Sequence, residues 1–163
     1  PWLLIGMLGG IGNSMILGNF DSTFAAHPEM ALYIPLIGGT GGNVGTQSSA
    51  LVVQGLANSS LNAENTFKQV LKESVVALIN ATIISMLVYI YNFIRFGATA
   101  TVSYSVSISL FAVVMFASIF GTLVPMTLEK LKIDPAIATG PFISITNDII
   151  GMLMYMGITV LLS

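Results

Sequence analysis

The stretch from Pro35 to Ala57, PLIGGTGGNVGTQSSALVVQGLA, has the length of a membrane span around a centre of small and polar residues. A helix that crosses the hydrocarbon of a bilayer needs roughly 20 mainly apolar residues. This stretch lies within a longer run, 30–57. Its glycines recur four residues apart, a spacing that lets two helices approach closely. We therefore predict a membrane-spanning helix with a tightly packed, polar middle.

The composition of the whole chain extends this prediction beyond one segment. Its 163 residues are 55% hydrophobic and only 7% charged, and the mean hydropathy is +0.90. A soluble domain carries about 25% charged residues. We therefore expect an all-α, polytopic membrane protein with five membrane-spanning helices in a single domain, residues 1–163. The predicted spans cover residues 1–18, 30–57, 74–95, 104–124 and 135–162.

Polar connections separate the predicted spans, and their basic residues predict the orientation of the chain. The connections cover residues 19–29, 58–73, 96–103 and 125–134. Within the second of them, Leu61, Asn62 and Glu64 open a short amphipathic helix. Basic residues accumulate in the cytoplasmic connections of membrane proteins. With five spans, the second and fourth connections lie on the same side of the membrane. They hold Lys68, Lys72, Lys130 and Lys132, whereas Arg95 lies on the opposite side. We therefore predict a cytoplasmic N-terminus and a C-terminus outside.

Several classes of protein are excluded by residues that the sequence lacks. The absence of cysteine excludes disulfides, iron–sulfur clusters and thiolate metal sites. Five basic residues are too few for a phosphate-binding patch that would hold a nucleic acid. The Gly-Lys-Ser/Thr loop of nucleotide-binding proteins and the His-Glu-x-x-His zinc motif are also missing. We predict no catalytic residues, no enzyme activity and no nucleic-acid partner.

Asp148 is the one acidic residue deep within a predicted span, and no span holds a basic partner for it. A charge in the hydrocarbon costs about 2.5–3.5 kcal/mol and usually faces a cavity or a partner. Ser144 and Gly151, four residues before and three after, share its helix face. A visiting cation explains such a carboxylate, although protonation or a hydrogen bond to another helix is an alternative. Gly140-Pro141 should disturb the same helix, as a packing kink or by freeing carbonyls to line a pore.

Asn43 and Gln47 lie four residues apart on one face of the glycine-rich span. Neutral amides suit a hydrated cation, because they accept hydrogen bonds from its water shell without trapping the ion. The alternative is a glycine-driven helix crossing in which the amides bond between helices. Glycine pairs with the required spacing are Gly6/Gly10, Gly38/Gly42 and Gly41/Gly45.

Three stretches resemble one known family, the MgtE magnesium channels. Residues 35–57 look like the second transmembrane helix of that family. Residues 133–151, IDPAIATGPFISITNDIIG, resemble the fifth, and the opening PWLLIGMLGG is similar to the start of the first. The resemblance covers essentially the whole chain, and the two long motifs are specific.

The resemblance implies a homodimer with one ion path between the subunits, lined mainly by the second and fifth helices. The family's pore carboxylate falls on Asp148, its pore-facing asparagine on Asn43, and the acid at the cytoplasmic mouth on Asp134. The family also has cytoplasmic N and CBS domains. The sequence starts within an apolar run at Pro1, so we expect it to be part of a longer chain that carries those domains. We expect the chain to belong to a multi-pass protein of the bacterial inner membrane.

Asp134 has two interpretations. It precedes Pro135, and an aspartate followed by proline suits the start of a helix. It also lies at the predicted cytoplasmic end, roughly 21 Å along a helix from Asp148, which is too far for both to hold one ion. A second, weaker divalent site that uses Asp134 is therefore the other prediction.

Magnesium is the expected ion, because it prefers octahedral oxygen ligands and sheds its water reluctantly. Asp148, Asn43, Ser144, Gly151, Asp134 and Gln47 are the candidate metal-site residues. Two other functions stay open. One is transport of Mn²⁺, Co²⁺ or a substrate coupled to Na⁺ or H⁺, and the other is a membrane assembly module that transports nothing.

Overall fold

The computed structural model describes residues 2–62, 65–97, 100–138 and 140–163, and every regular element in these ranges is a helix. The prediction of an all-α fold is therefore confirmed. The elements are α1 (Trp2–Gly18), α2 (Asp21–Ala26), the 3-10 helix η1 (Pro28–Tyr33), α3 (Ile34–Ala57), α4 (Thr66–Phe96), α5 (Thr101–Lys130), the 3-10 helix η3 (Pro135–Ala138) and α6 (Pro141–Leu162).

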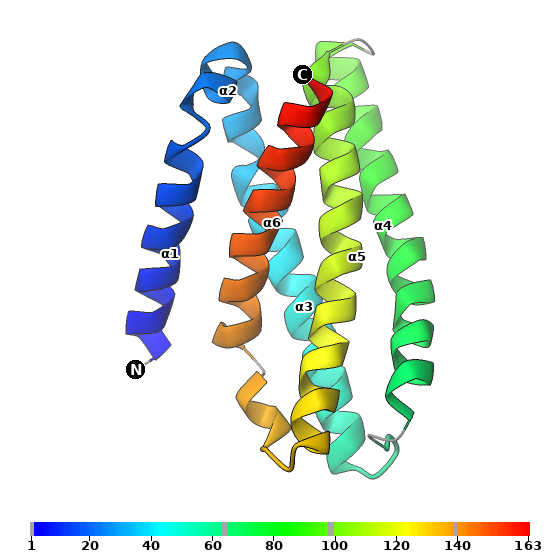
Figure 1. The fold of residues 1–163 in the computed structure, drawn as a ribbon. Coiled ribbons are helices and arrows are strands. Elements are labelled where there is room, and N and C mark those ends of the chain that lie inside the picture. The colour runs from blue at the N-terminus through cyan, green and yellow to red at the C-terminus, as the bar shows by residue number, and fades with distance from the viewer. Residues whose placement is uncertain (1, 63–64, 98–99, 139) are drawn as a thin grey trace.

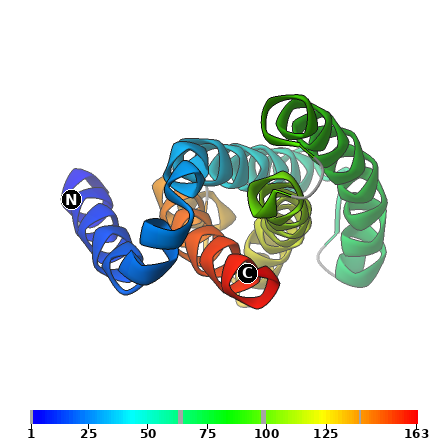
Figure 2. The ribbon, with the colours of Figure 1, turned by 90° about the horizontal axis from the view of Figure 1, so that it is seen from above.

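The five long helices stand side by side and alternate in direction, so that the two termini lie at opposite ends of the bundle (Figure 1). The connections from α3 to α4 and from α5 to α6 lie at the same end as the N-terminus. Helix α5 packs against α3, α4 and α6, whereas α1 packs mainly against α6. Seen from above, α1 and α4 form opposite edges of the bundle (Figure 2).

Three helices in the described part of the chain are long and apolar enough to cross a membrane, namely α4, α5 and α6. Helix α1 has 17 residues, about 26 Å at 1.5 Å per residue. Helix α3 has 24 residues, but its glycine-rich, polar centre lowers its mean hydropathy. Multiple membrane spans are thus supported, and the count of five stays a prediction.

The helices differ from the predicted boundaries where charged residues continue a helix. The connection 58–73 was expected to hold a separate amphipathic helix, but α4 runs unbroken from Thr66 to Phe96, while Glu64 lies outside the described residues. Similarly, α5 continues through Pro125 to Lys130, inside the segment predicted as a charged connection. Lysine and glutamate are good helix formers, so these helices extend past their apolar parts.

Two other predicted segments are also subdivided in the structure. The loop 19–29 contains α2 and the start of η1. The predicted fifth span, 135–162, is broken before Pro141, because Gly140 has a φ of +69°, a left-handed value that favours glycine. Pro141 then occupies the first turn of α6, where its missing N–H costs nothing. The predicted disturbance at Gly140-Pro141 is therefore confirmed as a helix start.

Buried polar groups hold the C-terminal end of the bundle together. The Tyr155 hydroxyl donates a hydrogen bond of 2.8 Å to the carbonyl of Met30, which ties α6 to η1. The Tyr33 hydroxyl donates to Oδ1 of Asn92 on α4 at 2.5 Å. All four of these residues are buried. Such bonds fix the short segment η1, which leads into the glycine-rich helix α3.

Candidate ion site between α3 and α6

Asp148 lies where α6 crosses the glycines of α3. A Cβ atom added at Gly42 would stand 3.2 Å from Asp148 Oδ1 and 3.1 Å from Ser144 Oγ. At Gly38 the added atom would stand 3.7 Å from the same carboxylate oxygen. The missing side chains of α3 therefore make room for the carboxylate, and Ser144 and Asp148 meet the same glycine, as the predicted shared face requires.

The carboxylate of Asp148 has no basic partner in the structure. Among the described residues the one ion pair joins His27 Nδ1 and Glu29 Oε1 at 3.6 Å, at the start of η1. Asp148 is half-buried. The absence of a counter-charge, which the sequence predicted, holds for the three-dimensional surroundings of this residue as well.

A small cavity of about 80 Å³ extends from Asp148 to helix α1. Its lining consists of Gly6, Gly9, Gly10, Asn13, Ile145 and Asp148. The Oδ1 atom of Asn13 is buried and has no hydrogen-bond partner among the described residues. Buried polar atoms are normally paired, so this amide oxygen points to a polar occupant such as water. Asp148 thus stands at the junction of α1, α3 and α6.

Asn13 was missed by the sequence analysis, although a signal for it existed. It lies three residues after Gly10 and seven after Gly6, so the three share one helix face. The spacing of Gly6 and Gly10 predicts a helix-packing pair. However, a Cβ at either position would meet nothing within 4 Å, so they mediate no helix contact within this chain. That part of the packing prediction is wrong for the single chain.

The packing prediction holds for the other glycine pairs. A Cβ at Gly41 would lie 2.8 Å from Val113 of α5, and one at Gly45 would clash with the amide of Asn147. Asn147 is 1% exposed, and its amide atoms have no partner. Asn147 does not line the cavity of Asp148. Gly45 therefore serves close packing of α6 on α3.

The remaining predicted residues are not gathered around Asp148. Asn43 and Gln47 are exposed on α3. Gly151 is buried against Val113, whose Cγ1 would lie 3.4 Å from an added Cβ, so Gly151 lets α6 approach α5. Its predicted place beside Asp148 on a lining face stays a prediction. No group of three or more His, Cys, Asp or Glu side chains that could hold a metal ion occurs among the described residues.

Asp134 lies in the connection from α5 to α6, just before η3. Its side chain is exposed, and Oδ1 accepts a hydrogen bond of 2.9 Å from the backbone N–H of Ala136. This contact is the helix-start interaction that the Asp-Pro sequence suggested. The structure therefore shows Asp134 in the capping role, whereas an ion site at Asp134 stays a prediction.

The site offers chemistry suited to a hard cation. A carboxylate and a hydroxyl from α6 and an amide oxygen from α1 lie beside the glycines of α3. Oxygen atoms of these kinds are the ligands, or the partners of the water shell, that Mg²⁺ and Ca²⁺ prefer. One chain contributes one carboxylate. Long apolar helices around such a group are the architecture of a helical membrane protein.

The chain belongs to the MgtE family, whose model, described as a divalent cation transporter, matches residues 34–158. It is 34% identical over 158 residues to the magnesium transporter MgtE of Bacillus subtilis (strain 168), and 33% identical over 161 residues to the protein of that name from Thermus thermophilus. The alignments cover 97% and 99% of this chain and 35% of each relative. The chain thus spans about a third of the length of these relatives. The family resemblance is therefore confirmed.

Proposed function

We propose that this chain is the pore domain of a channel through which Mg²⁺ enters the cell down its electrochemical gradient. The observation that carries the proposal is Asp148, an unpaired carboxylate held in a glycine-lined space between α3 and α6. Membership of a family of divalent cation transporters supports a cation as its ligand. An inside-negative membrane potential favours the entry of a divalent cation.

The proposed topology has five spans with the N-terminus in the cytoplasm. It is supported by the alternation of the five long helices and by the position of the lysines. The four lysines lie at the N-terminal end of the bundle, Lys68 and Lys72 in the first turns of α4 and Lys130 and Lys132 around the end of α5. Arg95 is in the last turn of α4, at the other end (Figure 1). This distribution is the one expected when that end faces the cytoplasm.

The proposed pore lies between two copies of the chain. Asn43 and Gln47 are polar side chains exposed on a helix that is otherwise surrounded by apolar helices. Unpaired amides are costly in hydrocarbon, so a partner subunit or a water-filled path explains their exposure better than lipid does. Two copies would also bring two Asp148 carboxylates to one path, which suits a divalent ion.

The residues act on an ion that keeps most of its water. The Asp148 carboxylates attract it, while the Ser144 hydroxyl and the amides of Asn43 and Gln47 bond to its water shell. Asn13 holds water beside the carboxylate from the α1 side. Neutral ligands keep binding weak enough for release, which conduction requires. Gly151 contributes indirectly, by setting the approach of α6 to α5.

Asp134 forms a second, weaker divalent site at the cytoplasmic mouth, in addition to its role at the start of η3. Cytoplasmic regulatory domains belong to the full-length protein in this proposal, and the protein is a multi-pass component of a bacterial inner membrane. Mn²⁺ and Co²⁺ are possible further cargoes.

Flux of Mg²⁺ into proteoliposomes tests the proposal with the full-length protein. Asp148→Asn keeps the size and polarity of the side chain but removes its charge, and we expect strongly reduced flux from a folded protein. Asp21→Asn is the matched control, because Asp21 is an exposed acid on α2, outside the bundle. Wild-type flux from folded Asp148→Asn would remove the pore role.

The same assay separates the other functions. Flux that persists without a proton or sodium gradient favours a channel, whereas flux that needs one favours a coupled transporter. Competition by Mn²⁺ and Co²⁺ measures selectivity. The absence of flux from well-folded protein would favour a membrane assembly module.

A further inference from the structure

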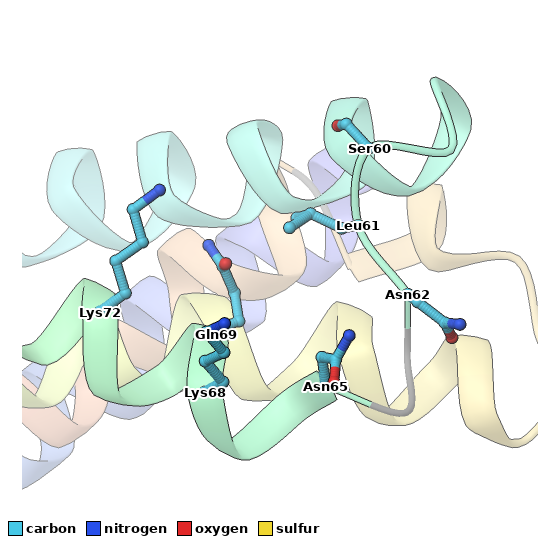
Figure 3. A pocket seen from close by; sticks show the side chains of 7 residues that line it. All are labelled: Ser60, Leu61, Asn62, Asn65, Lys68, Gln69 and Lys72. Atoms are coloured by element: carbon cyan, nitrogen blue, oxygen red, sulfur yellow. The ribbon is translucent and has the colours of Figure 1, made fainter.

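A hollow of about 370 Å³ opens between the end of α3 and the beginning of α4. Its polar lining comes from the connection, through Ser60, Asn62 and Asn65, and from the first turns of α4 (Figure 3). Lys68 and Lys72 line it from α4, and the Lys72 side chain extends toward α3. The proposed ion path uses none of these residues.

The charge of this hollow is positive. Lys68 and Lys72 are four residues apart, so they share one face of α4. Neither lysine makes an ion pair within the part of the chain that the structure describes. The amide of Gln69 between them donates to Glu73 Oε1 at 3.0 Å, so that carboxylate is already engaged. Two ammonium groups beside the side-chain amide of Asn65 suit a phosphate group.

A second hollow adjoins the first, and an acidic residue of α5 lines it. It shares Leu61 and Asn62 with the first hollow but is also lined by Glu129 of α5. An anion bound there would face a carboxylate. The lysines on α4 are therefore the favourable position for a negative ligand.

The length of α4 places the hollow at the level of lipid headgroups. Its 31 residues extend about 46 Å, whereas the hydrocarbon of a bilayer is about 30 Å thick. Arg95 marks the opposite end of the helix. A membrane span of about 20 residues that ends at Arg95 begins near Val75. Lys68 and Lys72 come before Val75, so they lie beyond the hydrocarbon, at the level of the lipid phosphates.

Apolar side chains beside the lysines favour a lipid over a free anion. Phe67 and Leu71 are 82% and 56% exposed on the same two turns of α4. An acyl chain can lie along these residues while its phosphate reaches the lysines. A phospholipid offers both groups in one molecule, whereas inorganic phosphate offers only one.

We propose that the hollow between α3 and α4 binds the phosphate headgroup of an anionic phospholipid through Lys68 and Lys72. The site rests on the proposed membrane topology, and it is independent of ion conduction through Asp148. A bound lipid braces the end of α3, the helix that carries the glycine-rich stretch.

Retention of phosphatidylglycerol by the full-length protein tests this site, measured by native mass spectrometry after transfer from mixed vesicles of phosphatidylcholine and phosphatidylglycerol. The double variant Lys68→Gln/Lys72→Gln should bind about twentyfold to thirtyfold more weakly, because each lysine near an anionic surface contributes about a factor of five. The matched control Lys130→Gln/Lys132→Gln makes the same charge change at the same end, outside the hollow. It should retain the lipid as the wild type does.

Three results would overturn the proposal. The first is unchanged retention by folded Lys68→Gln/Lys72→Gln, and the second is an equal loss in the control, which would mean a diffuse charge effect. The third is displacement of the lipid by an equal concentration of inorganic phosphate, which would make the ligand a free anion. Asp148→Asn should keep full lipid retention, so failure of the channel proposal leaves this result unaffected.

Discussion

Replacing Gly42 by alanine should move the Asp148 carboxylate without changing any charge. The added Cβ would stand 3.2 Å from Asp148 Oδ1 and 3.1 Å from Ser144 Oγ, while ordinary contacts lie at 3.4–4 Å. Both side chains must therefore give way by a few tenths of an ångström. The backbone of α3 can stay in place, since alanine is a better helix former than glycine.

The expected magnitude follows from Coulomb's law. A retreat of about 0.5 Å from a divalent ion held through water at about 4.5 Å weakens the attraction by about 0.7 kcal/mol at an effective dielectric constant of about 20. That value corresponds to about threefold in ion occupancy for one carboxylate, and to about tenfold for two. We expect Gly42→Ala to raise the Mg²⁺ concentration for half-maximal flux by a factor in this range.

Flux into proteoliposomes, measured over a series of Mg²⁺ concentrations together with thermal unfolding, checks this prediction. Gly157→Ala is the control, because a Cβ at that position of α6 meets nothing within 4 Å. Equal half-maximal concentrations for the two variants, at equal thermal stability, would refute the link between the position of the carboxylate and ion binding. A loss of stability without a change in affinity would assign Gly42 to helix packing alone.

Three further predictions concern residues around the proposed path. Asn13→Leu should reduce flux, because it removes an amide oxygen that lines the cavity of Asp148; Ser14→Leu, at the exposed neighbouring position, should not, and equal flux from both variants would exclude a role for the amide. Asn43→Cys should crosslink two subunits across the symmetry axis, and a strictly monomeric protein in mild lipid conditions would contradict the proposed dimer. Asp134→Ala should weaken Mn²⁺ binding from the cytoplasmic side in a titration while the Asp148 site stays intact; an unchanged titration with lower thermal stability would leave Asp134 only its role at the start of η3.

The parts of the structure that follow from local sequence were predictable. Glycines four residues apart indicate close helix contacts, and Gly45 indeed lies against α6. Asp148 was recognisable because a charge in an apolar run is costly wherever the helix packs. Gly140-Pro141 predicted a break by backbone geometry alone.

The parts that depend on three-dimensional neighbours were not predictable. Asn13 became a candidate only when α1 was seen to stand opposite Asp148 across a cavity. The unbroken helix α4 was missed because the polarity of 58–73 indicates exposure to water, and exposure does not end a helix. The spacing of Gly6 and Gly10 suggested a contact, but spacing does not specify which face meets a neighbour.

The hydrogen bond between Tyr155 and Met30 also has a mechanical consequence for α6. The helix is fixed near one end by this bond, and it starts at Gly140, whose backbone conformation separates it from η3. Asp148 lies seven residues from Tyr155, and Pro141 lies fourteen, about 10 Å and about 21 Å along the helix. A tilt of α6 about Tyr155 would therefore move Asp148 half as far as Pro141, and the close packing of Asn147 and Ile143 against Gly45 of α3 opposes such a tilt.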